Sequence, residues 1–181
     1  MPGGWATAKA DGTFVISNVP DGQAHVTVWG LGENSFIKSV RYGTSENTSR
    51  EVNITPGVNA SLEVTLSSRG GHITGMATTS DGLPGSAVWV VLVTDAANRN
   101  KYWLYKSANT DQNGIFEFRG IVPGQYELFS WDQVDQGAWE DPAFIKTFDD
   151  KRQGENVTIR EGETKVANIT TIHVDAQQDQ P

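Results

Sequence analysis

The chain has 181 residues, a formal net charge of −8 and no cysteine. An acidic surface repels phosphate backbones, so nucleic-acid binding is not expected. The lack of cysteine excludes disulfide bonds, thiol nucleophiles and zinc sites with cysteine ligands. No apolar run approaches the roughly 20 residues of a membrane span, and residues 1–20 contain no signal-peptide core. Residues 1–4 are typical of the start of an expressed fragment, so a removed signal or anchor stays open.

A stretch of the first half of the chain recurs in the second half without a gap. Residues 11–29 match residues 113–131 at a constant offset of 102 positions. The matched pairs are Gly12 with Gly114, Phe14 with Phe116, Ile16 with Phe118, Val19 with Ile121, Gly22 with Gly124, Gln23 with Gln125, Val26 with Leu128 and Trp29 with Trp131. Such a self-match predicts two related units. Glycine turns at short intervals, without helical periodicity, predict that both units are all-β.

The first unit is expected to consist of short strands that end at a glycine-rich linker, residues 67–71. A tight turn at Asp21 and Gly22 should join the first two strands. The last two should form a closing hairpin around residues 55–57. The expected strands are 14–19, 24–28, 36–42, 51–54 and 60–66.

Part of the second unit has no counterpart in the first. By the offset of 102, Trp5 corresponds to Ser107, so nothing in the first unit matches residues 70–106. The missing part amounts to about two strands, and their loss would leave exposed sheet edges. Three explanations stay open: a fragment cut inside a longer array, a reduced sandwich, or strands supplied by another chain through β-augmentation.

The second unit has signals for a complete set of strands. Residues 88–93 are almost continuously apolar, so this strand is expected at the centre of a sheet with both faces covered. Residues 113–131 should form a hairpin, and residues 132–150 a long loop. The pattern of Val157, Ile159 and Gly162 repeats that of residues 52–57. The expected strands are 72–78, 86–94, 102–108, the two strands of the hairpin within 113–131, 156–159 and 165–174.

The two copies of the repeated stretch, residues 11–29 and 113–131, resemble the carboxypeptidase regulatory-like domain family. The opening of that family, a Gly-x-Ile-x-Gly strand and an Asp-Gly-x-Pro turn, is matched by residues 71–75 and 81–84. The resemblance implies β-sandwiches of the prealbumin-like type, related to the B-type repeats of collagen-binding adhesins. It also implies accessory, stalk or spacer roles in secreted, periplasmic or cell-surface bacterial proteins.

Three arrangements in the sequence could carry chemistry. An isopeptide cross-link of the adhesin type would need a lysine near Met76, with Asn168 as acceptor and Glu127 assisting, and no lysine is present there. His25, His72 and His173 lie on separate predicted strands, so neither a metal site nor an enzyme is expected. Residues 109–114 resemble the start of a calcium loop, but a polar turn is favoured because Gly120 replaces the closing glutamate.

The loop 132–150 is the most informative stretch for function, since long structureless loops are often functional. In one interpretation its aromatic and acidic residues bind a sugar or a peptide. In the favoured one, Phe144 and Phe148 cover the edge of the sandwich and the acids are solvated. The candidate ligand-binding residues are Trp131, Trp139, Asp132, Asp135, Glu140 and Asp141. Trp5 and Trp103, with Trp139, are candidates for a contact surface.

The sequence therefore predicts two tandem prealbumin-like or Ig-like antiparallel β-sandwiches, the first lacking about two N-terminal strands. The expected domains are residues 1–68 and 69–175, followed by a polar tail, 176–181. The predicted function is a non-catalytic spacer, assembly or interaction module without cofactor, located outside the cytoplasm. Expected partners are other domains of a parent protein, or neighbouring copies that pair edge to edge. The alternative is a carbohydrate- or peptide-binding module that uses loop 132–150.

Overall fold

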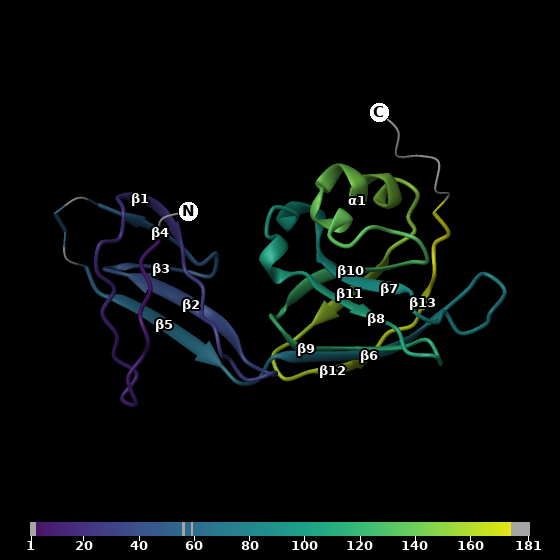
Figure 1. The fold of residues 1–181 in the computed structure, drawn as a ribbon, viewed down its shortest axis with the longest axis horizontal. Helices are drawn as coiled ribbons and strands as arrows, with labels where there is room; N and C mark the ends of the chain where they lie inside the picture. The colour runs from purple at the N-terminus through teal and green to yellow at the C-terminus, as the bar shows by residue number, and fades with distance from the viewer. Residues whose placement is uncertain (1–2, 56, 59, 175–181) are drawn as a thin grey trace. The chain divides into compact units, whose positions relative to one another are not determined.

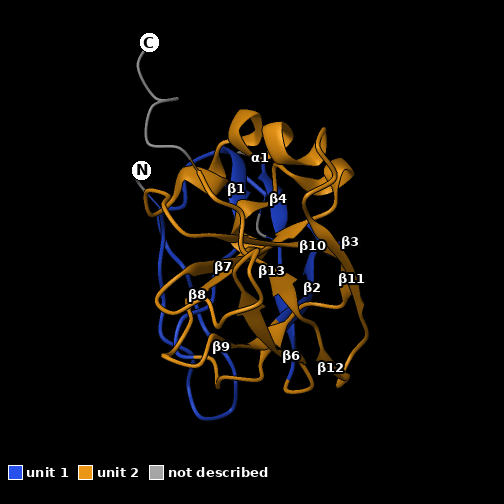
Figure 2. Cartoon of the chain, turned by 90° about the vertical axis from the view of Figure 1, so that its right-hand side faces the viewer, with its two compact units in different colours: residues 1–30, 37–67 blue, residues 31–36, 68–181 orange. Residues whose placement is uncertain are grey.

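The computed structural model describes residues 3–55, 57–58 and 60–174, and the chain divides into two compact units (Figure 2). Unit 1 comprises residues 1–30 and 37–67, and unit 2 comprises residues 31–36 and 68–181. Most of the regular structure is β (Figure 1), which confirms the predicted fold class. The predicted polar tail, 176–181, lies outside the described residues. No helix in the described part is both long and apolar enough to cross a membrane.

Unit 1 contains two small sheets. One has the order β1-β4 and the other β3-β2-β5. The buried side chains Ile37, Val40 and Val52 come from β2 and β4. The strands are β1 (Gly22–His25), β2 (Phe36–Tyr42), β3 (Ser45–Asn47), β4 (Glu51–Ile54) and β5 (Leu62–Ser67).

Two predictions for unit 1 were wrong. The closing hairpin does not form, because β4 pairs with β1 whereas β5 pairs with β2. The expected strand over residues 14–19 is not formed either, although Phe14, Ile16 and Val19 are half-buried as their alternation requires. Alternation predicts which side chains face inward, but a strand also needs a partner for its backbone groups.

Unit 2 is a β-sandwich with a third, helical layer (Figure 1). One sheet has the order β11-β10-β7-β8. In the other, β6 pairs antiparallel with β9 and parallel with β12 and β13, so the prediction of purely antiparallel pairing holds only in part. The strands are β6 (Gly71–Thr78), β7 (Trp89–Thr94), β8 (Lys106–Asn109), β9 (Ile115–Ile121), β10 (Gly124–Trp131), β11 (Glu155–Ile159), β12 (Thr164–Val166) and β13 (Ile169–Thr170).

Several consecutive strands of unit 2 lie in different sheets. Strand β9 pairs with β6, whereas β10 pairs with β7 and β11, so residues 113–131 do not form the predicted hairpin. Likewise β11 and β12 belong to different sheets. The turn after β9 is fixed in part by Tyr126, whose hydroxyl donates to the carbonyl of Val122 at 2.6 Å. The two successive strands within residues 113–131 therefore connect one sheet of the sandwich to the other.

The core of unit 2 lies between the two sheets. Side chains from both sheets form one buried apolar cluster, in which Leu92 on β7 and Leu128 on β10 are 0% exposed. A second cluster lies on the outer face of β7 and β10. Strand β7 is therefore covered on both faces, as its continuous apolar run predicts. The first cluster consists of Ile73, Ala77, Val88, Val90, Leu92, Phe116, Phe118, Ile121, Tyr126, Leu128, Val157, Ile159 and Ile169.

The sequence repeat is reproduced in the pairing of the strands. In unit 1, Gly22 lies opposite Ile54 in the β1–β4 pair. In unit 2, Gly124 lies opposite Ile159 in the β10–β11 pair. The preceding turns also agree, because Lys9 N–H donates to Thr13 O at 2.8 Å, and Asp111 N–H donates to Ile115 O at 3.0 Å, 102 positions further on.

The predicted loop 132–150 contains helices. A 3-10 turn, η3 (Ala138–Glu140), precedes the helix α1 (Pro142–Asp149). The Asp141 carboxylate caps α1 by accepting the N–H of Ala143 at 2.8 Å, and Pro142 occupies the first turn, where its missing N–H costs nothing. Ile145 and Phe148, three residues apart, are buried on one face. Residues 36–38 and 144–146 share the sequence Phe-Ile-Lys, but this match is not a structural repeat, since residues 36–38 lie in β2 and residues 144–146 in α1.

Gly75 on β6 is a position where a side chain cannot fit. The segment between β12 and β13 runs close beside β6 there, with Ala167 N–H donating to Thr74 O at 3.0 Å. A Cβ at position 75 would collide with the backbone of Ala167 and lie 2.8 Å from Cζ of Phe116. We expect Gly75→Ala to lower the free energy of unfolding of unit 2 by about 3 kcal/mol, because backbone must move to relieve the overlap.

Urea unfolding of the full chain, followed by near-ultraviolet circular dichroism, measures this loss. Gly32→Ala is the matched control in the same unit, because a Cβ there meets only Ser35 Oγ at 3.5 Å, which is ordinary contact. Equal stability of the two variants would contradict the close approach at Gly75.

Candidate functional site

The aromatic residues proposed as a binding platform are buried. Trp131 is 0% exposed and Trp139 is 4% exposed. The Trp131 ring stacks on Phe129 at a centroid distance of 5.3 Å and meets Phe148 edge-on at the same distance. Trp139 packs on Trp89 at 5.1 Å. These rings pack α1 and η3 onto the outer face of the sheet, so they present no platform to solvent.

The favoured interpretation of the loop agrees with this packing. Phe148 is buried and Phe144 is half-buried, and their rings lie 5.0 Å apart over Trp131. The helix covers the apolar outer face of β7 and β10, which would otherwise contact water. The four candidate acids, Asp132, Asp135, Glu140 and Asp141, are exposed as expected, whereas Asp149 of the same loop is half-buried and pairs with Arg99.

The four candidate acids differ in their hydrogen-bond partners. Asp132 pairs with His173 and accepts the Val174 N–H at 3.1 Å. Partial burial opposes ionisation of Asp132, but these two bonds outweigh it and hold its pKa below the ordinary value. Asp141 is occupied as the cap of α1. Within the described residues, the carboxylates of Asp135 and Glu140 make no hydrogen bond, and the four groups do not converge.

Sequence analysis missed a buried ionic cluster centred on Arg99. This guanidinium, 9% exposed, donates to Glu127 on β10 at 2.7 Å and to Asp149 at the end of α1 at 2.9 Å. It also donates to the carbonyl of Thr94 at the end of β7. These partners are 5, 28 and 50 positions from Arg99 in the sequence, so no short spacing pattern predicts the cluster. The Arg99 cluster links the region of the 3-10 turn η1 (Ala96–Asn98) to β10 and to α1.

Burial raises the pKa of Glu127. Loss of solvent, reinforced by the hydrogen bond with Asp149, raises the pKa of Glu127 despite the bond from Arg99. The folded state therefore binds a proton at Glu127 more readily than the unfolded state does. Between the ordinary and the raised pKa, the free energy of unfolding falls as pH rises.

The three histidines do not meet in a site. His72 on β6 bonds to Glu117 on β9 at 2.6 Å, and His173 pairs with Asp132. His25 lies on β1 of unit 1. Across residues 3–55, 57–58 and 60–174, no group of three metal-ligating side chains comes together.

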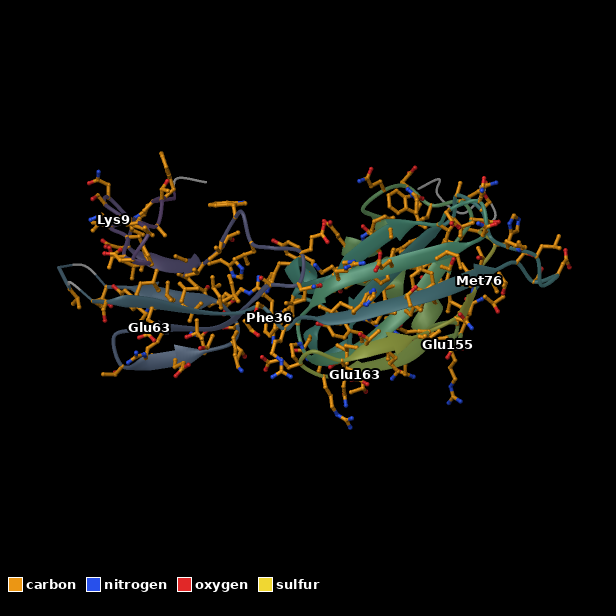
Figure 3. All side chains as sticks on the ribbon, turned by 90° about the horizontal axis from the view of Figure 1, so that it is seen from below. Lys9, Phe36, Glu63, Met76, Glu155 and Glu163 are labelled. Atoms are coloured by element: carbon orange, nitrogen blue, oxygen red, sulfur yellow. The ribbon has the colours of Figure 1, made fainter. Side chains whose placement is uncertain are left out.

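The remaining candidates have structural roles. Met76 lies on β6 (Figure 3), and its N–H donates to Oδ1 of Asn168 at 3.0 Å, so the candidate isopeptide acceptor bonds to backbone. Glu127, the proposed assistant, pairs with Arg99. The Asp111 carboxylate accepts the N–H groups of Asn113 and Ile115, each at 2.8 Å, which is the polar turn that was favoured over a calcium loop.

Two hollows in unit 2 are described by their lining residues, one open and one small. A shallow polar groove of about 580 Å³ is lined by Glu33, Glu117 and Arg119, and Arg119 bonds to Glu117 at 2.6 Å. A cavity of about 120 Å³ lies between α1 and residues 172–174. Of the tryptophans proposed for contacts, Trp5 is 77% exposed, while Trp103 is half-buried.

Comparison with known proteins gives distant structural likenesses. No protein-family profile matches the chain, and no curated relative does. A candidate carbohydrate-binding protein of Pseudomonas aeruginosa is 20% identical at a TM-score of 0.34, over 55% of this chain and 87% of its own. The 5-hydroxyisourate hydrolase of Klebsiella pneumoniae is 14% identical at 0.31, over 57% and 87%. The major pilin subunit of Bacillus cereus is 12% identical at 0.35, over 77% and 57%. At TM-scores below 0.5, none of these assigns a function.

Replacing the buried arginine should destabilise unit 2. Arg99→Met keeps much of the apolar stem but leaves Glu127 and Asp149 facing each other without a cation. We expect a loss of about 3 kcal/mol in the free energy of unfolding near neutral pH. The loss should shrink as pH falls, because protonation of Glu127 removes one of the two unpaired charges.

Urea unfolding at two pH values measures this dependence. Lys146→Met is the control, since Lys146 pairs with Asp150 on the exposed surface of α1, where side chains are 70% and 65% exposed. It should leave stability unchanged within error. A loss for Arg99→Met that is independent of pH would contradict the role assigned to Glu127.

Proposed function

We propose that this chain is a non-catalytic β-sandwich module of a secreted, periplasmic or cell-surface bacterial protein. It would act as a spacer, assembly or interaction module, as the resemblance to the carboxypeptidase regulatory-like family suggests. The supporting observation is that one strand pair is built twice in the same register, as β1–β4 and as β10–β11. Repeated small units of this kind are a common way to extend a protein with little new sequence.

The proposed action is mechanical and steric. Unit 2 uses its large aromatic side chains on its own packing, since Trp131, Trp139 and Phe129 all lie in one buried cluster. Arg99 and the cap at Asp141 hold α1 on that cluster. Domains over residues 1–68 and 69–175 would hold other parts of a parent protein apart, or pair with neighbouring chains through their sheet edges.

Carbohydrate or peptide binding by residues 132–150 is the second candidate. The observation in its favour is that Asp132, Asp135, Glu140 and Asp141 are all exposed. Carboxylates of this kind can accept hydrogen bonds from sugar hydroxyls or peptide amides. The buried Trp131 and Trp139 could not serve as its stacking platform without movement of α1.

The proposed location is tested on intact cells of the producing bacterium. Antibodies against the folded chain should label these cells without lysis, and added protease should remove the label. An abundant cytoplasmic protein of the same cells serves as the control, and it should become accessible only after lysis. Detection of the chain solely after lysis would contradict a surface or secreted module.

Glycan and peptide arrays separate the two candidates. A spacer or assembly module should bind no glycan or peptide on such an array above background. The second candidate predicts binding that disappears in Asp135→Asn with Glu140→Gln, two exposed acids outside the cap of α1. Binding that is lost in this double variant, with an unchanged circular dichroism spectrum, would replace the spacer proposal.

A further inference from the structure

Strand β9 forms one edge of its sheet in unit 2. Among residues 3–55, 57–58 and 60–174, β9 pairs with β6 and with no other strand. With seven residues, β9 is longer than the other edge strands of unit 2, which are β8, β11, β12 and β13. An edge strand carries backbone N–H and C=O groups that can pair with another chain. In the described part of unit 2, β9 therefore has the longest edge available for strand pairing.

The backbone groups of Glu117 and Arg119 point toward this edge. Gly114 O, just before β9, accepts an N–H of β6 at 2.8 Å. Because the direction of hydrogen bonding alternates along a strand, the groups of residues 116 and 118 also face β6, and those of 115, 117 and 119 face away. Ile115 agrees, since its N–H and C=O bond to the preceding turn at 2.8 and 3.0 Å. The described part of the chain gives the outward groups of Glu117 and Arg119 no hydrogen-bond partner.

The side chains of Glu117 and Arg119 place opposite charges on the outer face of β9. Both are exposed, and they bond to each other at 2.6 Å, so the alternation of the strand continues to Arg119. His72 on β6 also bonds to Glu117, at 2.6 Å. The hydrogen bond from Arg119, aided by that from His72, holds the pKa of Glu117 below its ordinary value. An open groove adjoins both side chains, so a second molecule can reach them.

Two copies of β9 are complementary in one antiparallel register. A pair of identical antiparallel strands has a two-fold axis. With the axis at Phe118, Glu117 of each copy lies opposite Arg119 of the other. This register also brings the outward N–H and C=O groups of residues 117 and 119 face to face, as a hydrogen-bonded pair requires. With the axis at Glu117 or at Arg119, like charges would lie opposite each other.

We infer that the edge of β9 is a self-association site, to which a second copy of this chain adds its own β9 antiparallel with the two-fold axis at Phe118. Charged residues on an edge strand normally oppose pairing with other chains. Here Glu117 and Arg119 oppose two neighbouring registers and favour the one between them. Because the contact is short, we expect a weak, reversible dimer. This site rests on the proposed function, since it would be the place where neighbouring copies assemble.

Charge reversal on the full chain tests the site. Sedimentation velocity over about a hundredfold range of concentration should show a dimer that forms as concentration rises. Glu117→Arg and Arg119→Glu each set like charges opposite each other, so each should weaken the dimer by about tenfold. An equimolar mixture of the two variants should form a heterodimer, because opposite charges then face each other at both positions. The double variant, Glu117→Arg with Arg119→Glu, should dimerise as the unchanged chain does.

A control variant and a second readout locate the contact. Glu155→Arg reverses an exposed charge on β11, an edge strand of the other sheet (Figure 3), and should leave the dimer unchanged. Residue-resolved hydrogen exchange of the unchanged chain follows the edge directly. Raising the protein concentration should slow exchange at Glu117 and Arg119, whereas Phe116 and Phe118, which already face β6, should change little.

Each outcome decides the inference. A dimer that both reversals weaken and that their mixture restores supports it. A chain that stays monomeric overturns it, as does a dimer that the reversals leave intact or that the mixture does not restore. Protection of Glu117 and Arg119 that appears only in cell extract would make another protein the occupant, and would also overturn it.

Two further safeguards keep the result clear. If a variant loses its circular dichroism spectrum, hydrogen exchange of the unchanged chain at rising concentration decides instead. Labelling of intact cells tests the proposed function separately. A monomeric chain on the cell surface would therefore overturn the β9 site and leave the spacer role in place.

Discussion

The central sheet of unit 2 has apolar side chains on both faces, and the rest of that unit depends on this constraint. In β7, Val90 and Leu92 point into one cluster, while Val91 and Val93 point into the other. Burying a side chain of this size contributes about 1.5 to 3 kcal/mol relative to leaving it in water. Both faces therefore need a cover. The sheet around β6 covers one face, and α1 with η3 covers the other.

The polar groups of unit 2 support the same arrangement. Asp141 begins α1, and Arg99 ties its end to β10 through Asp149 and Glu127. A helix of eight residues is marginal by itself, so packing and these contacts hold it. Most of the aromatic and acidic side chains that could suggest ligand binding by residues 132–150 therefore pack, cap or pair within unit 2. The exposed acids Asp135 and Glu140 are the members of that segment without such a role.

Periodicity in the sequence predicts much of this fold, because it reports which side chains face inward. The all-β class, the central position of residues 88–93 and the repeat of residues 11–29 in 113–131 all follow from it. Pairing partners do not follow, since inward-facing residues look alike whether the next strand lies in the same sheet or in the opposite one. For this reason β9 and β10 were expected to form a hairpin, although they lie in different sheets.

Short polar signals predict the helix that periodicity over the whole chain does not. Asp141 followed by Pro142 is a helix-start signal, and the spacing of Ile145 and Phe148 suits one helical face. The Arg99 cluster could not be foreseen, because its partners are brought together only by the tertiary fold. The four candidate acids are exposed as expected, but Asp149 of the same loop is half-buried beside Arg99, and the exposure of Trp131 and Trp139 was predicted wrongly.

The comparison between the two units has a direct physical consequence for backbone protection. Residue-resolved hydrogen exchange of the full chain, without added partner, measures it. We expect the amides of residues 90–93, in the doubly covered strand, to exchange most slowly, and the outward-facing amide of Thr27 to exchange several orders of magnitude faster than that of its counterpart Phe129. Similar protection at Thr27 and Phe129 would contradict this contrast, in which β7 pairs with β10 whereas, among the described residues, β1 pairs only with β4.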